Sequence, residues 1–269
     1  MSPTLRQRLD GAKATLGQVD VALGRKPGAL PADVEKAFRS VVDYRSDIDH
    51  WITMVDARTA AWDLLDGLES KADADDLVPF GATRAKFVHV RLIGVQAYVA
   101  TKWALADRIT GMVGRVLCTP DAGFNGASPA QLVSHFLQKD RKKMTAGALY
   151  ESLRCAFGWP VGISYAIRNH FVHDGGQMAG SDFFEASASA SAFRISDEGW
   201  SRIEKTAQEK YVVDSSLHHA GATWPVSPRD DLRVVLRVCE RETDDALGVL
   251  LGSACNTLLG HVGFMLGEA

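Results

Sequence analysis

The chain has 269 residues, 46% hydrophobic and 23% charged, which is a globular composition and excludes a chain that is disordered throughout. Thirty lysines and arginines oppose 33 aspartates and glutamates, and the resulting net charge of −3 excludes attraction to nucleic acid or to an anionic membrane by the overall field of the protein. Any contact with RNA therefore has to be made by a local group of basic residues.

The cysteines indicate a reducing compartment. They are far apart, lie in apolar surroundings and form no Cys-x-x-Cys pair: Cys118, Cys155, Cys239 and Cys255. This spacing predicts neither a zinc site nor a disulfide framework, so we expect no metal and no other cofactor. Charged residues follow Met1 closely, and a signal peptide is not expected. Both observations predict a cytoplasmic location.

Two helices are predicted at the start of the chain. Apolar residues recur at three- and four-residue steps over 5–23 and again over 33–70, and Lys26-Pro27-Gly28-Ala29-Leu30-Pro31 breaks the pattern between them. An acidic stretch at 73–76 and the segment Pro79-Phe80-Gly81 predict a linker. We therefore expect an N-terminal helical hairpin over residues 1–76 and a separate helical domain over 84–269.

Three more helices are predicted between residues 83 and 173. A long and largely buried helix is expected from Thr83 to Leu117, where apolar residues continue without a proline. Ser128-Pro129 has the cap and first-turn proline of a short helix that runs to about Gln138. Residues 148–173 predict a further helix with a kink or break at Trp159-Pro160.

The densest basic cluster follows the predicted short helix. It comprises Lys139, Arg141, Lys142 and Lys143, with Asp140 among them. Such a cluster is either a solvated helix end or a place of phosphate contact, and the sequence favours neither alternative. We therefore keep these four residues as candidates for substrate binding.

The last third of the chain begins with a different pattern. Residues 181–196 alternate small polar and apolar types, which predicts a short strand or hairpin. A helix is expected from Asp197 to Tyr211, a loop over 214–229, and a long closing helix from Asp230 to Leu266. The predicted fold is therefore mainly α, with a short β-like insertion near 181–196.

The closing helix also raises a membrane alternative. Residues 246–267 carry no formal charge and hold the spacings Gly248-x-x-x-Gly252 and Gly263-x-x-x-Gly267, which occur where membrane helices meet. Several polar residues inside the run lower its hydropathy, namely Ser253, Asn256, Thr257 and His261. We expect a core helix that packs closely through its small residues, against the long helix at 83–117, and no membrane partner.

One segment, Arg168-Asn169-His170-Phe171-Val172-His173, carries the clearest chemistry in the chain. On a helix, Asn169 and His173 are four residues apart and share a face, which Arg168 reaches with its long side chain. Gly175-Gly176 predicts the end of the helix, so His173 falls in the last turn. There the helix dipole and the neighbouring carboxylate favour an imidazolium, which suits a proton donor.

This segment resembles the active-site motif of HEPN-domain ribonucleases and toxins. An asparagine follows the arginine directly, four residues separate Arg168 from His173, and the motif ends an apolar helix between two long helices. The resemblance covers about 84–269 and implies a small helical bundle that forms a homodimer with two motifs facing each other. It further implies cleavage of RNA without a metal, the 2′-hydroxyl attacking the neighbouring phosphate.

The resemblance also implies roles for single residues. His173 would be the general acid or base, Arg168 would stabilise the charged phosphorane, and Asn169 would orient one of them. His170 is either structural or a secondary RNA contact, and we keep it among the candidates for substrate binding. HEPN toxins that are regulated by nucleotidylation often carry a tyrosine two residues after the histidine, where this chain has Gly175. That form of regulation is therefore not expected.

Three interpretations follow. The first is a metal-independent endoribonuclease, acting as a toxin or an antiphage-defence effector and restrained by an antitoxin or another defence-system partner. The second is a non-catalytic HEPN-like module that binds RNA, a nucleotide or a protein. The third is a plain dimeric scaffold. An intact pair of Arg168 and His173 favours the first.

Overall fold

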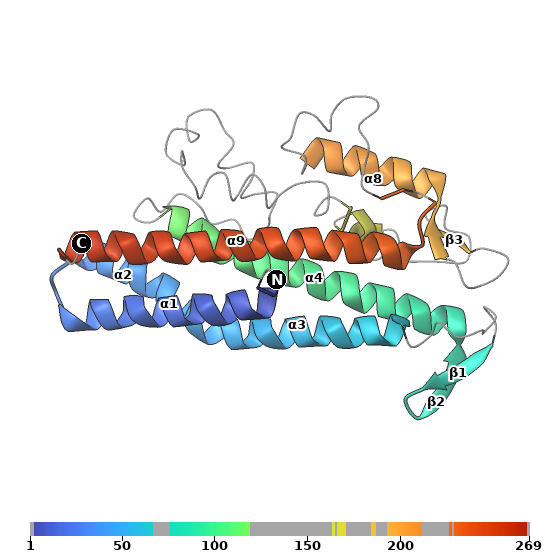
Figure 1. Cartoon of the computed structure of the whole chain (residues 1–269), viewed down its shortest axis with the longest axis horizontal. Coiled ribbons are helices and arrows are strands. Elements are labelled where there is room, and N and C mark those ends of the chain that lie inside the picture. Colours follow the sequence, from blue (N-terminus) through green and yellow to red (C-terminus); the bar gives the residue numbers. More distant parts are fainter. Residues whose placement is uncertain are drawn as a thin grey trace. The chain divides into compact units, whose positions relative to one another are not determined.

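The computed structural model describes residues 3–66, 76–118, 163–164, 166–170, 184–186, 193–210, 226–227 and 229–267. Within these ranges the protein is mainly α-helical and its long helices are bundled, as the sequence predicts (Figure 1). The described elements are α1 (Leu5–Arg25), α2 (Ala32–Val42), α3 (Tyr44–Asp66), β1 (Leu77–Phe80), β2 (Thr83–Lys86), α4 (Phe87–Cys118), β3 (Phe184–Ala186), β4 (Phe193–Ile195), α8 (Asp197–Lys210) and α9 (Leu232–Leu266).

The described chain divides into two compact units. Unit 1 takes the described residues within Met1–Val55, Ala104–Phe157 and Thr243–Ala269, and unit 2 takes those within Asp56–Trp103 and Gly158–Glu242. Three long helices, α3, α4 and α9, therefore contribute residues to both units. These bounds differ from the predicted hairpin of 1–76 and domain of 84–269, whose independent folding stays a prediction.

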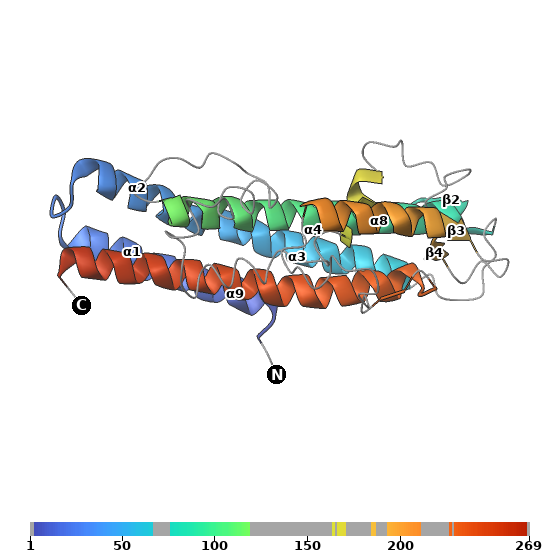
Figure 2. The ribbon, with the colours of Figure 1, turned by 90° about the horizontal axis from the view of Figure 1, so that it is seen from above.

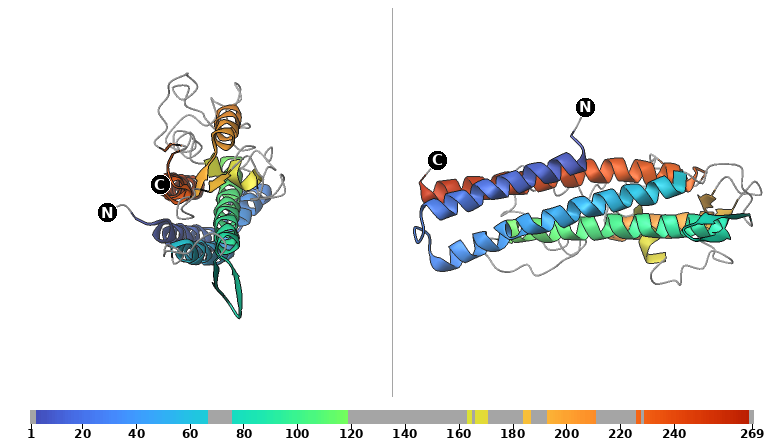
Figure 3. Two further views of the ribbon diagram at one scale, coloured as in Figure 1. Left: turned by 90° about the vertical axis from the view of Figure 1, so that its right-hand side faces the viewer. Right: turned by 90° about the horizontal axis from the view of Figure 1, so that it is seen from below.

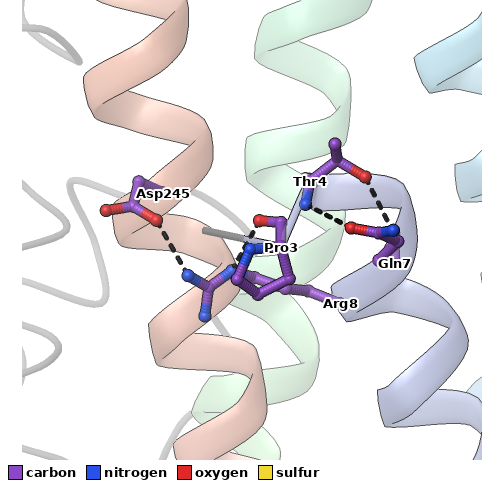
Figure 4. A network of polar contacts seen from close by, with 5 residues as sticks. All are labelled: Pro3, Thr4, Gln7, Arg8 and Asp245. Atoms are coloured by element: carbon purple, nitrogen blue, oxygen red, sulfur yellow. Dashed lines mark hydrogen bonds and ion pairs between the residues drawn. The ribbon is translucent and has the colours of Figure 1, made fainter. Parts of the chain in front are cut away.

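Helix α1 begins at Leu5, as the sequence predicts, and ends at Arg25, two residues beyond the predicted pattern and directly before the predicted breaker. Its start is fixed by a capping box. The backbone N–H of Gln7 donates to Thr4 Oγ1 at 3.3 Å, and the backbone N–H of Thr4 donates to Gln7 Oε1 at 2.8 Å (Figure 4). After Arg25 the chain turns through Gly28, whose φ of 74° is a conformation that glycine adopts without strain. The predicted breaker therefore separates α1 from α2.

In unit 1, α1 runs parallel to the last part of α9 (Figure 3). Near one end, an Arg8 guanidinium nitrogen donates to Asp245 Oδ1 at 2.8 Å (Figure 4). At the other end, Lys26 Nζ donates to the carbonyl oxygen of Leu266 at 2.7 Å. The buried face of α1 supplies its part of the core of unit 1 with Leu5, Leu9, Ala12, Leu16, Val19, Ala22 and Leu23.

The prediction of a single helix over 33–70 is wrong, because α2 and α3 are separate helices that meet at Asp43. The Asp43 carbonyl accepts both the amide of Ser46 at 3.2 Å and its hydroxyl at 2.8 Å. A serine side chain that takes a backbone carbonyl competes with the continuing helix. Asp43 nevertheless keeps right-handed helical angles, so the apolar period runs through the joint and does not reveal it.

The linker predicted at Pro79-Phe80-Gly81 is a β-hairpin instead. Strand β1 pairs antiparallel with β2, with Phe80 opposite Thr83 and Leu77 opposite Lys86. A two-residue turn that contains Gly81, with a φ of 58°, joins them. Because 83–86 belong to this hairpin, the long helix α4 begins at Phe87, one turn later than predicted.

The core of unit 2 joins the first part of α9 to α4 (Figure 2). The Tyr98 hydroxyl donates to the carbonyl of Leu236 at 3.4 Å, and the Trp62 ring meets the Tyr98 ring edge-on at 5.2 Å between centroids. The prediction that the closing helix packs against the long helix is confirmed for these residues. Further buried members of this core include Val95, Val99, Ile163, Ile167, Ile195, Trp200, Ile203, Leu232, Val235 and Cys239.

The hairpin predicted within 181–196 is confirmed for the described residues. Strand β3 pairs antiparallel with β4, with Phe184 opposite Ile195. The following residue, Ser196, caps α8 by accepting the amide of Gly199 at 2.9 Å. The helix predicted at 128–138, the basic cluster at 139–143 and the kink at 159–160 lie outside the described residues.

Helix α9 is, within the described ranges, the one helix that is long and apolar enough to cross a membrane. Only the length and the composition of α9 indicate a membrane span, and 39% of its most apolar 18-residue window is buried inside the protein. A core helix of a water-soluble protein meets the same criteria. The finding is therefore weak evidence, and it is compatible with the predicted core helix.

Candidate functional site

The beginning of the motif lies on a helical segment that is anchored in the core of unit 2. Residues 166–170 are helical, and Ile163, Ala166 and Ile167 belong to the same buried cluster as Trp200 and Ile203 of α8. Because Ile167 directly precedes Arg168 and is fully buried, the backbone that carries the arginine is held in place by core packing.

Arg168 and Asn169 lie side by side at the border of this core. Both are partly exposed, and an Arg168 guanidinium nitrogen donates to Asn169 Oδ1 at 3.0 Å. A guanidinium has five N–H donors in a planar fork, and this contact uses one of them while limiting the orientations of the others. Such an oriented guanidinium suits a phosphate, which accepts two parallel hydrogen bonds.

His170 is buried, with only 3% of its surface exposed. The structural interpretation of this residue fits that position, because a buried imidazole contributes to packing and takes part in internal polar contacts. An RNA contact would require its side chain to become accessible. The role of His170 in substrate binding therefore stays a prediction.

The remaining predicted site residues are not described. His173, for which the resemblance implies acid–base chemistry, lies outside the described residues, and so do Lys139, Arg141, Lys142 and Lys143. Of the predicted set, the structure thus brings together Arg168, Asn169 and His170. The roles of the others stay predictions.

No group of three histidine, cysteine or acidic side chains gathers within the described ranges in the way that a metal ion requires. Cys239 and Cys255 are buried free thiols. Burial raises the pKa of Cys239 to about 11 and the pKa of Cys255 to about 12. Neither thiol is therefore a ready nucleophile at neutral pH, because the thiolate is the reactive form.

Sequence reasoning missed three buried cations among the described residues of unit 2. Arg58, Arg91 and Lys102 are each less than a tenth exposed. Arg58 lies 3.1 Å from a carboxylate oxygen of Glu240, and Arg91 lies 3.6 Å from one of Asp231. Burying a charge costs free energy unless it is paired, so these contacts help to allow Arg58 and Arg91 into the core.

A sequence signal for these cations did exist. Buried residues of α3 follow one another at steps of four, three and four residues, and Arg58 occupies one of these positions. The others are Trp51, Val55 and Trp62. Arg91 and Lys102 occupy the outer positions of the same spacing around Val95 and Tyr98. A charged residue at a position that the helical period assigns to the core is the mark of a buried pair.

Asp231 joins three elements near the start of α9. Its carboxylate accepts the backbone amide of Arg233 at 2.9 Å, which caps the helix, and it also pairs with Arg91 of α4. Its backbone bridges to Arg194 of β4. Leu232 and Ile195, the neighbours of these two bridged residues, belong to the core on which the motif segment packs.

Comparison of the chain with models of protein families, with curated proteins and with solved structures returned no match. The observations above therefore define a class by fold alone: a mainly α-helical bundle. Its candidate site is a partly exposed arginine–asparagine pair on a helical segment anchored in the core.

Proposed function

We propose that the protein is a metal-independent endoribonuclease of the HEPN type. The single observation that supports this most directly is the hydrogen bond of 3.0 Å from Arg168 to Asn169. The Arg168 guanidinium lies at the edge of the core of unit 2. Buried Ile167 holds the backbone of Arg168, and Asn169 orients its side chain. A charge stabiliser for a phosphorane needs this kind of preorganisation.

In the proposed reaction the 2′-hydroxyl of a ribose loses its proton and attacks the adjacent phosphorus. The bond from phosphorus to the 5′-oxygen of the next nucleotide breaks, and that oxygen takes up a proton. The products are a 2′,3′-cyclic phosphate and a free 5′-hydroxyl. Arg168 stabilises the charge on the phosphorane oxygens, Asn169 orients Arg168, and His173 transfers a proton.

The proposal includes a homodimer in which two motifs face each other. One motif supplies a single arginine and a single histidine, whereas the reaction requires both a base for the 2′-hydroxyl and an acid for the 5′-oxygen. Two copies related by a two-fold axis supply both. Light scattering at micromolar concentration tests this point, and a monomer that is active at the same concentration would contradict it.

The proposed role is that of a cytoplasmic toxin or antiphage-defence effector that damages RNA and is restrained by an antitoxin or another defence-system partner. The balanced net charge supports an enzyme that recognises RNA locally rather than one that coats it. Growth of cells in which expression is induced tests the role. Toxicity that depends on Arg168 is expected.

The decisive experiment is incubation of purified protein with end-labelled single-stranded RNA in the presence of EDTA. We expect cleavage with 2′,3′-cyclic phosphate ends, because the attacking group is the RNA's own hydroxyl. DNA of the same sequence should stay intact, since it lacks that hydroxyl. Binding of RNA without cleavage would instead support a non-catalytic HEPN-like module, whose Arg168–Asn169 pair holds a phosphate without chemistry.

A further inference from the structure

A second group of polar side chains lies in unit 1, on the last part of α4. Arg108, Gly111 and Arg115 are separated by three and four residues and therefore share one face of the helix. Seven residues span nearly two turns, so the two arginines are about 10 Å apart along the helix axis. Both arginines are exposed.

Tyr44, the first residue of α3, lies beside this face of the helix near Gly111 and Arg115. The Arg115 guanidinium lies over the Tyr44 ring, 5.4 Å from its centroid. The Tyr44 hydroxyl lies 4.0 Å from the point where a Cβ on Gly111 would be, and no other described side chain comes within 4 Å of that point. The ring thus lies under Arg115 and directs its hydroxyl to the open surface of the helix at Gly111.

The electrostatics of Tyr44 show that both arginines act on this hydroxyl. Burial raises the pKa of Tyr44 and is the largest effect, Arg115 lowers it, Asp47 raises it, and Arg108 lowers it. Because the net direction is upward, the phenol stays protonated at neutral pH and is able to donate a hydrogen bond. Two cations and one carboxylate therefore act electrostatically on a hydroxyl that is a hydrogen-bond donor.

Contacts among the described residues do not explain Arg108 or Gly111. A glycine inside a helix lowers the stability of that helix relative to alanine. Arg108 forms no ion pair or hydrogen bond with any residue in the described part of the chain. An anion bound near Arg108 would use the space that Gly111 leaves.

We propose that Arg108, Arg115 and the Tyr44 hydroxyl form a binding site for a phosphate group. The planar guanidinium forks match the oxygens of phosphate, and the hydroxyl supplies a further donor between them. The absence of a side chain at Gly111 lets the phosphate approach the helix. The site does not depend on the proposed ribonuclease activity, because it uses none of the residues around Arg168.

The phosphate belongs either to an RNA backbone or to a small ligand such as a nucleotide, and binding experiments with three probes distinguish these sources. The probes are inorganic phosphate, AMP and a single-stranded RNA oligonucleotide with 2′-O-methyl groups, which cannot be cleaved. Affinity for the wild-type protein is measured by calorimetry for the first two and by fluorescence anisotropy for the third. Tighter binding of the oligonucleotide than of AMP assigns the site to RNA, and the reverse order assigns it to a nucleotide.

Two pairs of variants test the site itself. Arg108→Gln and Arg115→Gln should each weaken binding of the preferred probe by about ten- to a hundredfold, the value of a lost hydrogen bond to a charged group. The matched control is Arg25→Gln, which removes the same charge from an exposed position at the end of α1. Gly111→Leu should block the site, whereas Gly111→Ala should retain binding because its Cβ meets only the Tyr44 hydroxyl at ordinary contact distance.

The proposal is overturned if none of the three probes binds the wild-type protein. It is also overturned if Arg25→Gln weakens binding as much as Arg108→Gln does, because the effect is then one of overall charge. Tyr44→Phe should weaken binding while circular dichroism shows unchanged helicity. Binding that is unaffected by Arg108→Gln in a protein of normal helicity would contradict the assignment whatever the outcome of the cleavage assay.

Discussion

Arg58 on α3 and Glu240 on α9 form an ion pair of 3.1 Å in which the arginine side chain is only 4% exposed. Glu240→Ala should lower the free energy of unfolding by about 3 kcal/mol, because it removes a carboxylate that pairs with a buried guanidinium. Urea denaturation followed by circular dichroism measures this change. The matched control is Glu242→Ala, whose pair with Arg241 is exposed and should contribute less than about 0.5 kcal/mol. Equal effects of the two substitutions would contradict a special role for Glu240.

Two glycines of α9 should respond in opposite ways to the same substitution. A Cβ on Gly248 would collide with the Arg8 side chain, whereas a Cβ on Gly252 meets nothing within 4 Å. Gly252→Ala should stabilise the protein by up to about 1 kcal/mol through helix propensity. Gly248→Ala should be less stable than Gly252→Ala by about 1–2 kcal/mol, because the displaced Arg8 loses its contact with Asp245. Thermal unfolding of both variants measures the difference, and a more stable Gly248→Ala protein would show that Arg8 moves aside without cost.

Substitutions in the motif test the proposed chemistry. Arg168→Ala and His173→Ala should each lower the rate of RNA cleavage by roughly a hundred- to ten-thousand-fold while leaving helicity nearly unchanged. The controls are Arg25→Ala and His261→Ala, which remove the same side-chain types from exposed positions. His170→Ala should act mainly on the free energy of unfolding and less on the rate of RNA cleavage, because this side chain is buried. Full activity of the His173→Ala protein would contradict the proposed mechanism.

The buried thiols predict a dependence of stability on pH. The folded protein raises the pKa of Cys239 to about 11 and of Cys255 to about 12, mainly through burial, from an ordinary value of 9.0. This contribution to stability is fully present below pH 9 and is lost as the pH rises through the folded-state values. The urea midpoint should therefore be lower at pH 10.5 than at pH 8.

The same burial predicts resistance to alkylation. At pH 8, iodoacetamide should modify Cys239 and Cys255 slowly in the native protein and rapidly in urea, which peptide mapping by mass spectrometry distinguishes. Rapid native modification of either residue would show that its surroundings open on the timescale of the reaction.

Fractionation decides between the two interpretations of α9. We expect the expressed protein in the supernatant after ultracentrifugation without detergent, because the last part of α9 contacts α1 and its first part contacts α4. The glycines and polar residues between 246 and 267 also weaken insertion into a bilayer. Recovery only with membranes, resistant to alkaline carbonate, would favour the spanning alternative.

The sequence by itself determined the elements whose signals are local. The apolar period over 5–23 and the breaker at 26–31 predict α1 and its end, and alternation predicts the hairpin of β3 and β4. The pattern did not reveal the joint at Asp43, because the apolar period continues through it. It also missed the hairpin of β1 and β2, whose four-residue strands are too short to show a period beside a long helix.

Only the tertiary structure decided which polar residues are brought together. Arg168 and Asn169 are neighbours in sequence, so their proximity was predictable, but the buried core that holds them comes from segments far apart in the chain. The partners of Arg58 and of Tyr44 likewise lie on other helices. A helical period states which face of a helix is apolar, but not which helix covers it. Ion pairs and sites formed between helices therefore depend on packing, which is a property of the whole chain.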